Sequence, residues 1–215
     1  MKSKRFLTIL QLILAFAFFS AWSNVFMVPI PYSLPDFDNQ LYTIRVNGTD
    51  TLVLADGTFT LNETIIVEDS ATLIIENATV VFDTASYTVI ESYDNGTVHI
   101  EGSVIERGLW HYLRFHDSSN VSILRSEIKE IRNDGSANVK IDASSIGVVN
   151  NWGSSHFTLA NSSVGTVSSY ESSCTVVYDS TVNGIGALQS SDSMISNSTI
   201  GDTTLGFISN SNVML

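Results

Sequence analysis

The chain has 215 residues, of which 44% are apolar and only 15% are charged, and its formal net charge at pH 7 is -12. The length allows one sizeable domain or two small ones, and the acidic balance argues against nucleic acid as a partner because the surface repels phosphate groups. Cys174 is the only cysteine, so no internal disulfide can form. Strand- and turn-forming residues are plentiful, and we expect very little helix beyond residue 30.

Residues 1–23 have the pattern of a secretory signal peptide. Three basic residues near the start precede an apolar run, and Ala21-Trp22-Ser23 matches the small-x-small cleavage pattern. The alternative is an uncleaved N-terminal membrane anchor, because apolar residues continue as far as Ile30. Either reading places the body of the protein outside the cytoplasm, extracellular or at the cell surface, and membrane contact is expected only if the segment stays uncleaved.

Residues 24–50 contain all three prolines of the chain and are expected to form a linker and an N-terminal cap. From Thr51 onward, short segments of apolar and β-branched residues alternate with turn signals such as Asp56-Gly57 and Asn95-Gly96. These segments predict strands at Leu52–Leu54, Ile65–Val67, Leu73–Ile75, Val80–Phe82 and Thr88–Ile90.

From Asp117 onward the sequence repeats every 18 residues. Three columns of equivalent positions keep this register without an insertion, two of them aliphatic and one of them serine. The columns are Ile123, Ile141, Leu159, Val177, Ile195 and Val213; Ile128, Ile146, Val164, Val182 and Ile200; and Ser126, Ser144, Ser162, Ser180 and Ser198. A fixed period of this length indicates a solenoid. One further row, starting at His99, is expected upstream.

Within each row we expect the core-facing sites to fall in alternating pairs, at positions 5 and 7, 10 and 12, and 15 and 17 of the row that starts at Asp117, with serine at position 10 and apolar residues at the others. Alternation with a period of two predicts short strands whose paired side chains face one side, and no helical spacing survives over a row. Each row is therefore expected to be one rung of a parallel coil in which equivalent side chains stack. We expect the position-4 asparagines to form an interior or corner ladder, at Asn120, Asn138 and Asn210.

Two other coils fit this repeat less well. A left-handed triangular β-helix, the alternative fold, favours aliphatic residues at position 13, which instead holds Lys129, Gly147, Gly165 and Asn183. A calcium-binding nonapeptide roll needs a G-G-x-G-x-D run, which the chain lacks. We therefore predict an all-β fold, a single right-handed parallel β-helix over residues 51–215 with regular 18-residue rungs in its C-terminal half. The rung pattern resembles the right-handed parallel β-helix (pectate-lyase-like) superfamily of secreted proteins, in architecture only.

The resemblance implies a polysaccharide lyase or glycoside hydrolase as one candidate function, and glycoside hydrolysis needs two carboxylates that face each other. No column collects such carboxylates; position 8, for example, holds Leu124, Asp142, Ala160 and Tyr178. Regular metal-ligand spacing is also lacking among the histidines, His99, His111, His116 and His156. We therefore predict no catalytic residue, no metal ion and no cofactor.

Basic residues gather in one part of the chain: of the seven Lys and Arg beyond residue 23, six lie between Arg107 and Lys140. In rows of 18, Arg107 lies over Arg125, His111 over Lys129 and Arg114 over Arg132, which predicts a local basic patch. One interpretation is a network neutralised by Glu106, Glu127 and Glu130. The other is a binding site for an anionic glycan or an acidic partner surface, made of Arg107, His111, Arg114, Arg125, Lys129, Arg132 and Lys140.

Seven N-x-Ser/Thr sequons fit an exported protein. The glycosylation candidates are Asn47, Asn62, Asn77, Asn95, Asn161 and Asn197, and the seventh sequon is at Asn120. A separate aromatic column, at position 18, holds Trp152, Tyr170 and Leu188. Pointing outward they would form a ribbon that stacks on sugars or contacts a protein, and pointing inward a core ladder; we favour stacking as a structural feature.

The sequence given stops in the middle of a row, on the apolar pair Met214-Leu215, without a polar cap. Either the sequence is a fragment of a longer chain, or the last rung is covered by another subunit, which predicts a homo-oligomer or filament formed through the C-terminal rung. The preferred function is a secreted or cell-surface, non-catalytic β-helix with a structural or adhesive role that includes self-assembly. The alternatives are a lyase or hydrolase with a degenerate site, and a glycan-binding module that uses the basic patch.

Overall fold

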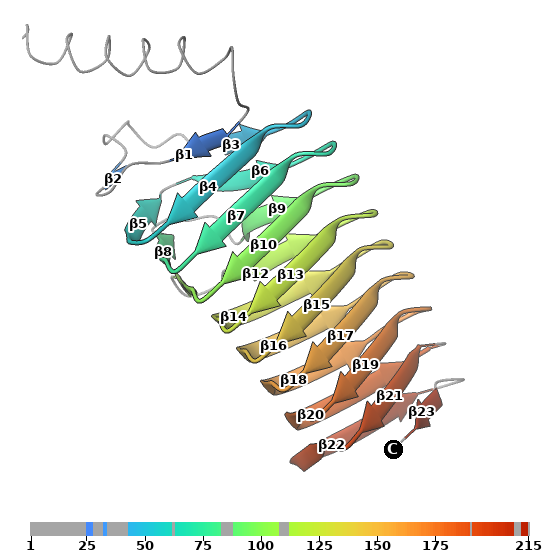
Figure 1. The fold of residues 1–215 in the computed structure, drawn as a ribbon. Helices are drawn as coiled ribbons and strands as arrows, with labels where there is room; N and C mark the ends of the chain where they lie inside the picture. Colours follow the sequence, from blue (N-terminus) through green and yellow to red (C-terminus); the bar gives the residue numbers. More distant parts are fainter. Residues whose placement is uncertain are drawn as a thin grey trace, which may run out of the picture.

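The computed structural model describes residues 25–27, 32–33, 43–61, 63–82, 88–107, 112–189, 191–208 and 212–214. In these residues the fold is all-β, with strands β1 to β23 and no helix, as predicted. Every strand pairing is parallel, and the strands wind into a rod of stacked rungs (Figure 1). The predicted signal peptide lies outside the described residues. The right-handed sense of the coil stays a prediction.

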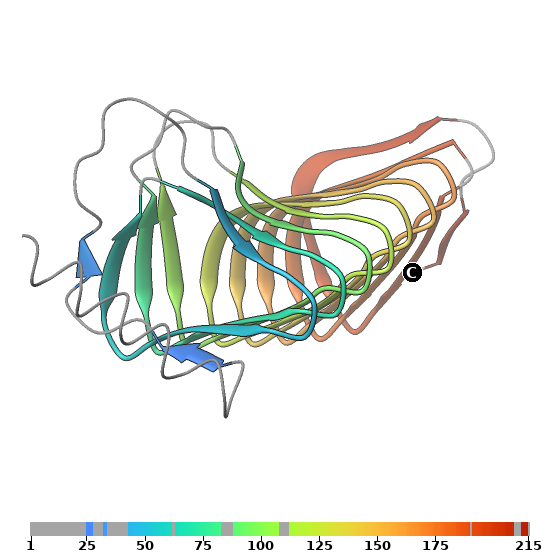
Figure 2. The same ribbon diagram turned by 90° about the horizontal axis from the view of Figure 1, so that it is seen from above.

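Two sheets form the walls of the rod, and they face each other when the rod is viewed from its end (Figure 2). The first sheet has ten strands, one from each rung. They are β1 (Val25–Met27), β4 (Thr51–Ala55), β7 (Thr72–Glu76), β10 (Thr97–Glu101), β13 (Asn120–Leu124), β15 (Asn138–Asp142), β17 (His156–Ala160), β19 (Cys174–Tyr178), β21 (Asp192–Ser196) and β23 (Asn212–Met214).

The second sheet has thirteen strands. The early rungs contribute two short strands each: β2 (Tyr32–Ser33), β3 (Thr43–Val46), β5 (Thr58–Leu61), β6 (Thr64–Val67), β8 (Thr79–Phe82), β9 (Thr88–Ser92), β11 (Val104–Arg107) and β12 (Tyr112–Phe115). From β14 onward one longer strand replaces each pair: β14 (Glu127–Asn133), β16 (Ser145–Asn151), β18 (Ser163–Ser169), β20 (Thr181–Leu188) and β22 (Thr199–Ile208). β14 joins the two arrangements because it pairs with both β11 and β12. The predicted strands near Leu52, Ile65, Leu73, Val80 and Thr88 are confirmed as β4, β6, β7, β8 and β9.

The 18-residue register is confirmed from β13 to β21, but the predicted last step is wrong: Val213 pairs with Ser193 and not with Ile195, a step of 20 residues, after register shifts between β20 and β22. Ile123 pairs with Ile141, and Ile141 pairs with Leu159, so these side chains lie in one file. All three are buried, and their file continues the core formed between the two sheets. A rung cannot bury such residues alone, so each one is stabilised by its equivalents in the rungs above and below.

The upstream rungs are longer, and the predicted row starting at His99 is wrong. His99 pairs with Ser122, because Thr97 pairs with Asn120 across a step of 23 residues. The step before it, from Thr72 to Thr97, is 25 residues. The additional residues fall between β8 and β9 and between β11 and β12, where later rungs have one continuous strand.

The interior asparagine ladder lies in a different column from the predicted one. Asn120 is exposed at the start of β13, so the interior form of the ladder predicted at position 4 is wrong. Asn120 pairs with Asn138 directly after the turns, which agrees with the corner alternative, and Asn210 lies outside the described residues. The buried asparagines are Asn133 and Asn151, at position 17, where apolar residues were expected. Asn133 Nδ2 donates to Asn151 Oδ1 at 2.9 Å, and Asn151 Nδ2 donates to the carbonyl oxygen of Cys174 at 3.1 Å. The inward direction of position 17 is confirmed, but its chemistry is polar.

The column of serines forms the corner between the first and the second sheet, which we call the serine corner. The residue before each serine has a positive φ, for example 49° at Ala143. The serine hydroxyl then takes two roles: Ser144 Oγ accepts from the backbone nitrogen of Ser126 at 3.1 Å and donates to the carbonyl oxygen of Asp142 at 2.7 Å. The same pattern joins the serines from Ser103 to Ser198, so the repeated serine is explained by hydrogen bonding between rungs.

Ser144→Ala is expected to lower the free energy of unfolding by about 1–2 kcal/mol, because the buried nitrogen of Ser126 loses its acceptor. Ser145→Ala is the matched control, since that neighbouring side chain is exposed on β16, and it should change stability by less than about 0.5 kcal/mol. Urea unfolding followed by circular dichroism measures both variants. Equal stability of the two would show that the ladder contributes nothing.

Candidate functional site

The turns that lead from the second sheet back to the first lie along one edge of the rod, which we call the turn rim. Each turn contains a residue with positive φ, and this is an aspartate at Asp69, Asp94 and Asp117, a residue type that tolerates this conformation. These carboxylates also hold the neighbouring rung. Asp69 Oδ2 accepts from the backbone nitrogen of Gly48 at 3.0 Å, and Asp117 Oδ2 lies 3.4 Å from the nitrogen of Asp94.

Acidic, aromatic and histidine side chains stack just before these turns. The backbone register aligns them as one column: Glu68, Tyr93, His116, Asp134, Trp152 and Tyr170. The adjacent outward column on the second sheet is Arg45, Ile66, Glu91, Arg114, Arg132 and Asn150. The two columns together are the best candidate for a functional surface on the described part of the chain.

Aromatic rings in the rim column stack on their neighbours along the rod. The rings of Tyr93 and His116 are 4.5 Å apart and inclined by 4°, and those of Trp152 and Tyr170 are 3.8 Å apart and inclined by 9°. The guanidinium carbon of Arg132 lies 5.5 Å from the Trp152 ring centroid, within the range of a cation–π contact. Because ring faces are covered by one another, the column presents mainly ring edges to solvent. The predicted stacking of Trp152 on Tyr170 is confirmed.

The stacked arginines share a single carboxylate. Arg114 pairs with Arg132 across β12 and β14, as predicted. Asp134 accepts from Arg114 Nε at 2.8 Å and lies 3.4 Å from Arg132 Nε. Like charges on adjacent rungs would repel each other, so the shared carboxylate offsets that cost.

The compensating acids predicted from the sequence do not take this role. Among the described residues, Glu106, Glu127 and Glu130 form no ion pair, and the acid that partly offsets the charge of the stack is Asp134. Asp134 is two residues after Arg132 and directly follows the end of β14. From there its carboxylate reaches the arginines of two rungs.

Two rim groups have shifted pKa values. Burial, followed by a hydrogen bond to Glu91 Oε2 at 2.6 Å, raises the pKa of Tyr93 to about 12. Burial, and after it the positive charge of Arg114, lowers the pKa of His116, although Asp134 lies 3.8 Å from Nδ1 and acts in the opposite direction. His116 Nε2 is buried without a hydrogen-bond partner among the described residues. The ring is thus held neutral between a tyrosine and a carboxylate that already serves two arginines.

Acidification is expected to destabilise the rod through His116. The pKa of His116 is lower in the folded chain than its usual 6.5, so the unfolded chain binds the proton first as the pH falls. This contribution to stability is therefore complete above pH 6.5 and is lost progressively below it, down to the lowered pKa of the folded state. Urea unfolding between about pH 8 and pH 5 measures the loss.

His116→Phe keeps a ring to stack on Tyr93 but cannot titrate, so it should flatten this part of the pH dependence. His156→Phe is the comparison variant, because His156 is exposed on β17. An unchanged pH profile in His116→Phe would contradict the assignment.

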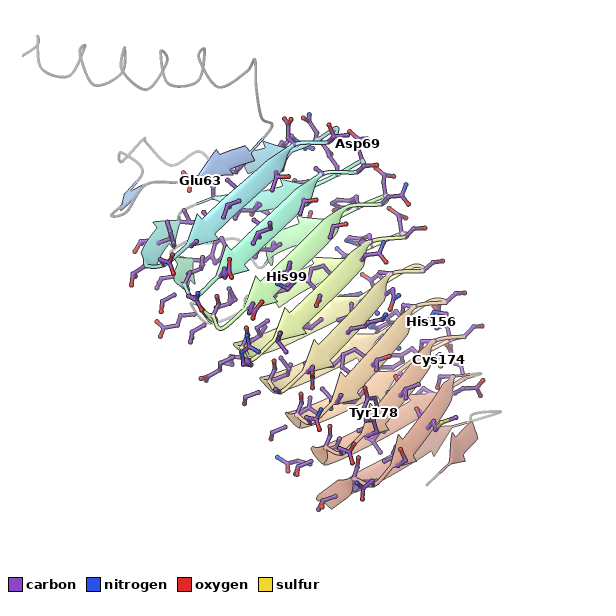
Figure 3. The ribbon with its side chains drawn as sticks, viewed as in Figure 1. Glu63, Asp69, His99, His156, Cys174 and Tyr178 are labelled. Atoms are coloured by element: carbon purple, nitrogen blue, oxygen red, sulfur yellow. The ribbon has the colours of Figure 1, made fainter. Side chains whose placement is uncertain are left out.

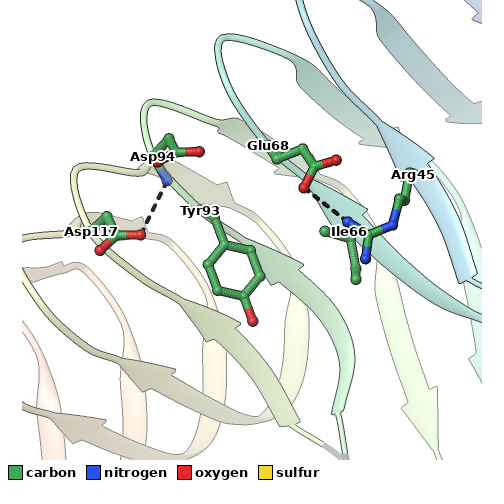
Figure 4. A pocket seen from close by; sticks show the side chains of 6 residues that line it. All are labelled: Arg45, Ile66, Glu68, Tyr93, Asp94 and Asp117. Atoms are coloured by element: carbon green, nitrogen blue, oxygen red, sulfur yellow. Dashed lines mark hydrogen bonds and ion pairs between the residues drawn. The ribbon is translucent and has the colours of Figure 1, made fainter.

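A shallow depression opens beside the first rim turns. Its volume is about 310 Å³, and Figure 4 shows the residues that line it, which are Arg45, Ile66, Glu68, Tyr93, Asp94 and Asp117. The cation is already neutralised, since Arg45 Nη1 lies 2.9 Å from Glu68 Oε2. The other polar groups of the lining are Tyr93 and the acidic Asp94 and Asp117, so the depression offers no free cation to an anionic ligand.

The structure distributes the predicted basic residues over several faces. Arg114 and Arg132 are the only described pair that it brings together on adjacent rungs. Arg125 lies at the serine corner and forms an ion pair with Glu101. Lys129 is on the second sheet and Lys140 on the first. A binding role for these residues stays a prediction, but the members with described side chains do not all lie on one face of the rod.

The predicted stack of Arg107 on Arg125 is wrong. Glu101 pairs with Leu124, and Ile105 pairs with Ile128. In this register the neighbour of Arg125 on the preceding rung is Gly102, and not Arg107. On its other side, β11 pairs Arg107 with Phe82. The cause is again the long upstream rung. His111 lies outside the described residues, and its predicted position over Lys129 is therefore untested.

A second group of reactive residue types lies on the outward face of the first sheet. His156 pairs with Cys174, and Cys174 pairs with Asp192; Figure 3 shows His156 and Cys174 on this face. Burial, and then the charge of Asp192, raises the pKa of the Cys174 thiol, which disfavours the thiolate that binds metals. In the described residues, no group of three or more histidine, cysteine or acidic side chains is placed to hold a metal ion.

Sequence reasoning missed several members of the two columns, among them Arg45, Glu68, Glu91, Tyr93 and Asp134. Tyr93 and His116 are 23 residues apart, so a fixed period of 18 does not align them. The signal that identifies them is the turn itself, because Tyr93-Asp94 and His116-Asp117 both place a ring directly before an aspartate with positive φ.

No family model, curated protein or solved structure matches this chain. Within the described ranges, no helix has the length and apolar character needed to cross a membrane.

Proposed function

We propose that the chain is a secreted or cell-surface β-solenoid with a non-catalytic, structural or adhesive role. The observation that carries the proposal is the pairing of arginine side chains with carboxylates within the rod. Each of the four arginines with a described side chain is paired with a carboxylate of the same or an adjacent rung; the pairs are Arg45 with Glu68, Arg114 and Arg132 with Asp134, and Arg125 with Glu101. The cations thus link rungs to one another, as a structural role requires.

The same pairing supports a structural rod over a glycan-binding module. An anionic glycan needs donors that are free to turn toward it, whereas these guanidinium groups already have anionic partners. The lysines of the predicted patch, Lys129 and Lys140, belong to different sheets. A flexible anionic chain would have to reach around the rod to contact both.

The rim carboxylates also favour structure over hydrolysis. Glycoside hydrolysis needs one carboxyl group as acid and a second as base or nucleophile. Asp134 is held by Arg114 and Arg132, and Glu91 accepts from Tyr93 Oη at 2.6 Å. These carboxylates are engaged in holding neighbouring side chains.

Two measurements test the proposal. Protease treatment of intact cells that make the protein should degrade it, with an antibody to the chain as the readout, and protection would contradict the extracellular placement. The purified chain should release no new reducing or unsaturated ends from a panel of acidic and neutral polysaccharides, and turnover of any of them would replace the structural role by an enzymatic one.

Retention on an array of anionic glycans would favour the binding module. An Arg114→Ala/Arg132→Ala double variant then shows whether the rim is responsible, and Lys140→Ala on the other sheet is its control. Self-assembly through the C-terminal rung is proposed with the adhesive role, and it predicts that the sedimentation coefficient of the purified chain increases with concentration.

A further inference from the structure

We propose that the folded protein accepts an N-linked sugar at the turn-rim asparagines Asn47 and Asn95. At the serine corner, hydrogen bonds of the side-chain amides prevent the same modification of Asn161 and Asn197. The donor would be an activated sugar, carried on a phosphate or pyrophosphate leaving group. The inference rests on the proposed extracellular placement, because N-linked sugars are a modification of exported proteins. It goes beyond that placement because it divides the sequons by whether the amide nitrogen Nδ2 of the asparagine is already hydrogen-bonded.

The serine corner generates sequons for reasons of folding. Its first residue has a positive φ, 48° at Asn161 and 47° at Asn197, and asparagine is favoured there among residues with a side chain. The second residue is a ladder serine, and the third begins a strand of the second sheet with an exposed Ser163 or Thr199. The triplets Asn-Ser-Ser and Asn-Ser-Thr therefore follow from the corner and do not by themselves indicate a sugar.

The corner amides are already engaged with carboxylates. Asn161 Nδ2 donates to Asp142 Oδ1 at 2.8 Å, and Asn197 Nδ2 donates to Asp179 Oδ1. Both bonds connect adjacent rungs and are strengthened by the charge of the acceptor. Asn77 lies at the same corner, and its Oδ1 faces the next rung, where a Cβ added to Gly102 would lie 2.7 Å away. The amides at this corner thus point along the rod.

The side-chain amides of the rim asparagines, unlike those of the corner, are exposed and not engaged with a carboxylate of a described residue. Asn47 and Asn95 are exposed, and each is followed by a glycine of a rim turn. Their backbones are fixed: Asp50 N donates to the Asn47 carbonyl at 3.1 Å, and Asn95 N donates to the Asp69 carbonyl at 2.9 Å. Among the described residues neither side-chain amide makes a hydrogen bond, so Nδ2 is available.

The transfer step shows why the state of Nδ2 decides the outcome. Nδ2 forms a bond to the anomeric carbon of the sugar, while the bond from that carbon to the phosphate-bearing oxygen breaks. The leaving group takes the electron pair, and one proton of Nδ2 passes to a base of the transferring enzyme. An amide held by a carboxylate must first give up that hydrogen bond and turn outward, which the rim amides need not do.

The test compares the folded chain with its own peptides. The purified full chain is incubated with a soluble N-glycosyltransferase and a nucleotide-activated hexose, and mass spectrometry quantifies the hexose on each sequon. A proteolytic digest of the same protein, treated identically, gives the reactivity of each sequon without the fold. The ratio of folded to digested occupancy should be about tenfold higher at Asn47 and Asn95 than at Asn161 and Asn197.

Two variants sharpen the result. Asp142→Ala should raise the occupancy of Asn161 in the folded chain several-fold and leave Asn197 unchanged, and Asp179→Ala should do the reverse. Both aspartates are exposed, so their loss spares the core.

Equal ratios at all four asparagines, an unmodified rim in the folded chain, or an unresponsive Asn161 in Asp142→Ala would each overturn the proposal. The assay does not depend on export. A failure here is therefore distinct from a failure of the protease test of extracellular placement.

Discussion

Replacing Gly165 with alanine is expected to destabilise the solenoid by about 3 kcal/mol. Gly147 and Gly165 lie on adjacent rungs where the strands of the second sheet bend, and a Cβ added at Gly165 would overlap the carbonyl oxygen of Gly147. That oxygen belongs to the backbone and cannot rotate away as a side chain would. Relief of the overlap must therefore disturb the pairing of β16 with β18. Urea unfolding of the purified variant measures the loss.

Gly201→Ala is the matched control for this prediction. It lies in the same column, but the nearest atom to its added Cβ is the Cα of Asn183, at 3.1 Å. The gain of about 0.5–1 kcal/mol from a stiffer unfolded chain should largely offset that milder crowding. If Gly165→Ala unfolded at the same urea concentration as the unchanged chain, the two backbones could not be as close as the structure places them.

The repeat was predictable from the sequence because every regular rung needs an aliphatic side chain at the same core position. Ile123 and Ile141 fill equivalent spaces between the sheets, so the period is preserved wherever no residue is inserted. The upstream rungs could not be aligned in this way, since their steps are 25 and 23 residues and not 18. Periodicity therefore gave the wrong neighbour for His99, whose partner is Ser122.

Periodicity also shows which residues stack without showing which way they point. Asn120 and Asn133 belong to columns that both contain asparagine, but only Asn133 faces inward. The direction depends on where each strand begins relative to its turn, and a shift of one residue reverses every side chain. The sequence alone does not specify that boundary.

The candidate site was predictable only in part for a related reason. The register correctly placed Arg114 over Arg132, because both lie in strands of matching rungs. The carboxylate that they share, Asp134, belongs to the turn, and its reach is set by the geometry of that turn. Side-chain partners of this kind are fixed by three-dimensional packing, which a table of equivalent positions does not contain.

Asn151→Ala is expected to lower the free energy of unfolding by about 3 kcal/mol. Asn151 is fully buried and links four groups: it accepts from Asn133 Nδ2 at 2.9 Å and from Ser155 Oγ, and it donates to the Cys174 carbonyl and to Thr175 Oγ1. Alanine leaves these groups short of a partner inside the rod and also creates a cavity. Asn150→Ala is the control, because its half-buried side chain lies on the outer face of the same strand.

A double-mutant cycle separates the ladder from simple loss of volume. When both members of a buried hydrogen bond become apolar, neither is left unsatisfied, so Asn133→Val with Asn151→Val should cost less than the sum of the single changes. We expect a coupling of about 1–2 kcal/mol between these two positions and none between Asn133 and Asn150. Additive losses at Asn133 and Asn151 would mean that the two amides do not act as a pair, and the buried asparagines would then have to be explained by their separate bonds to the backbone.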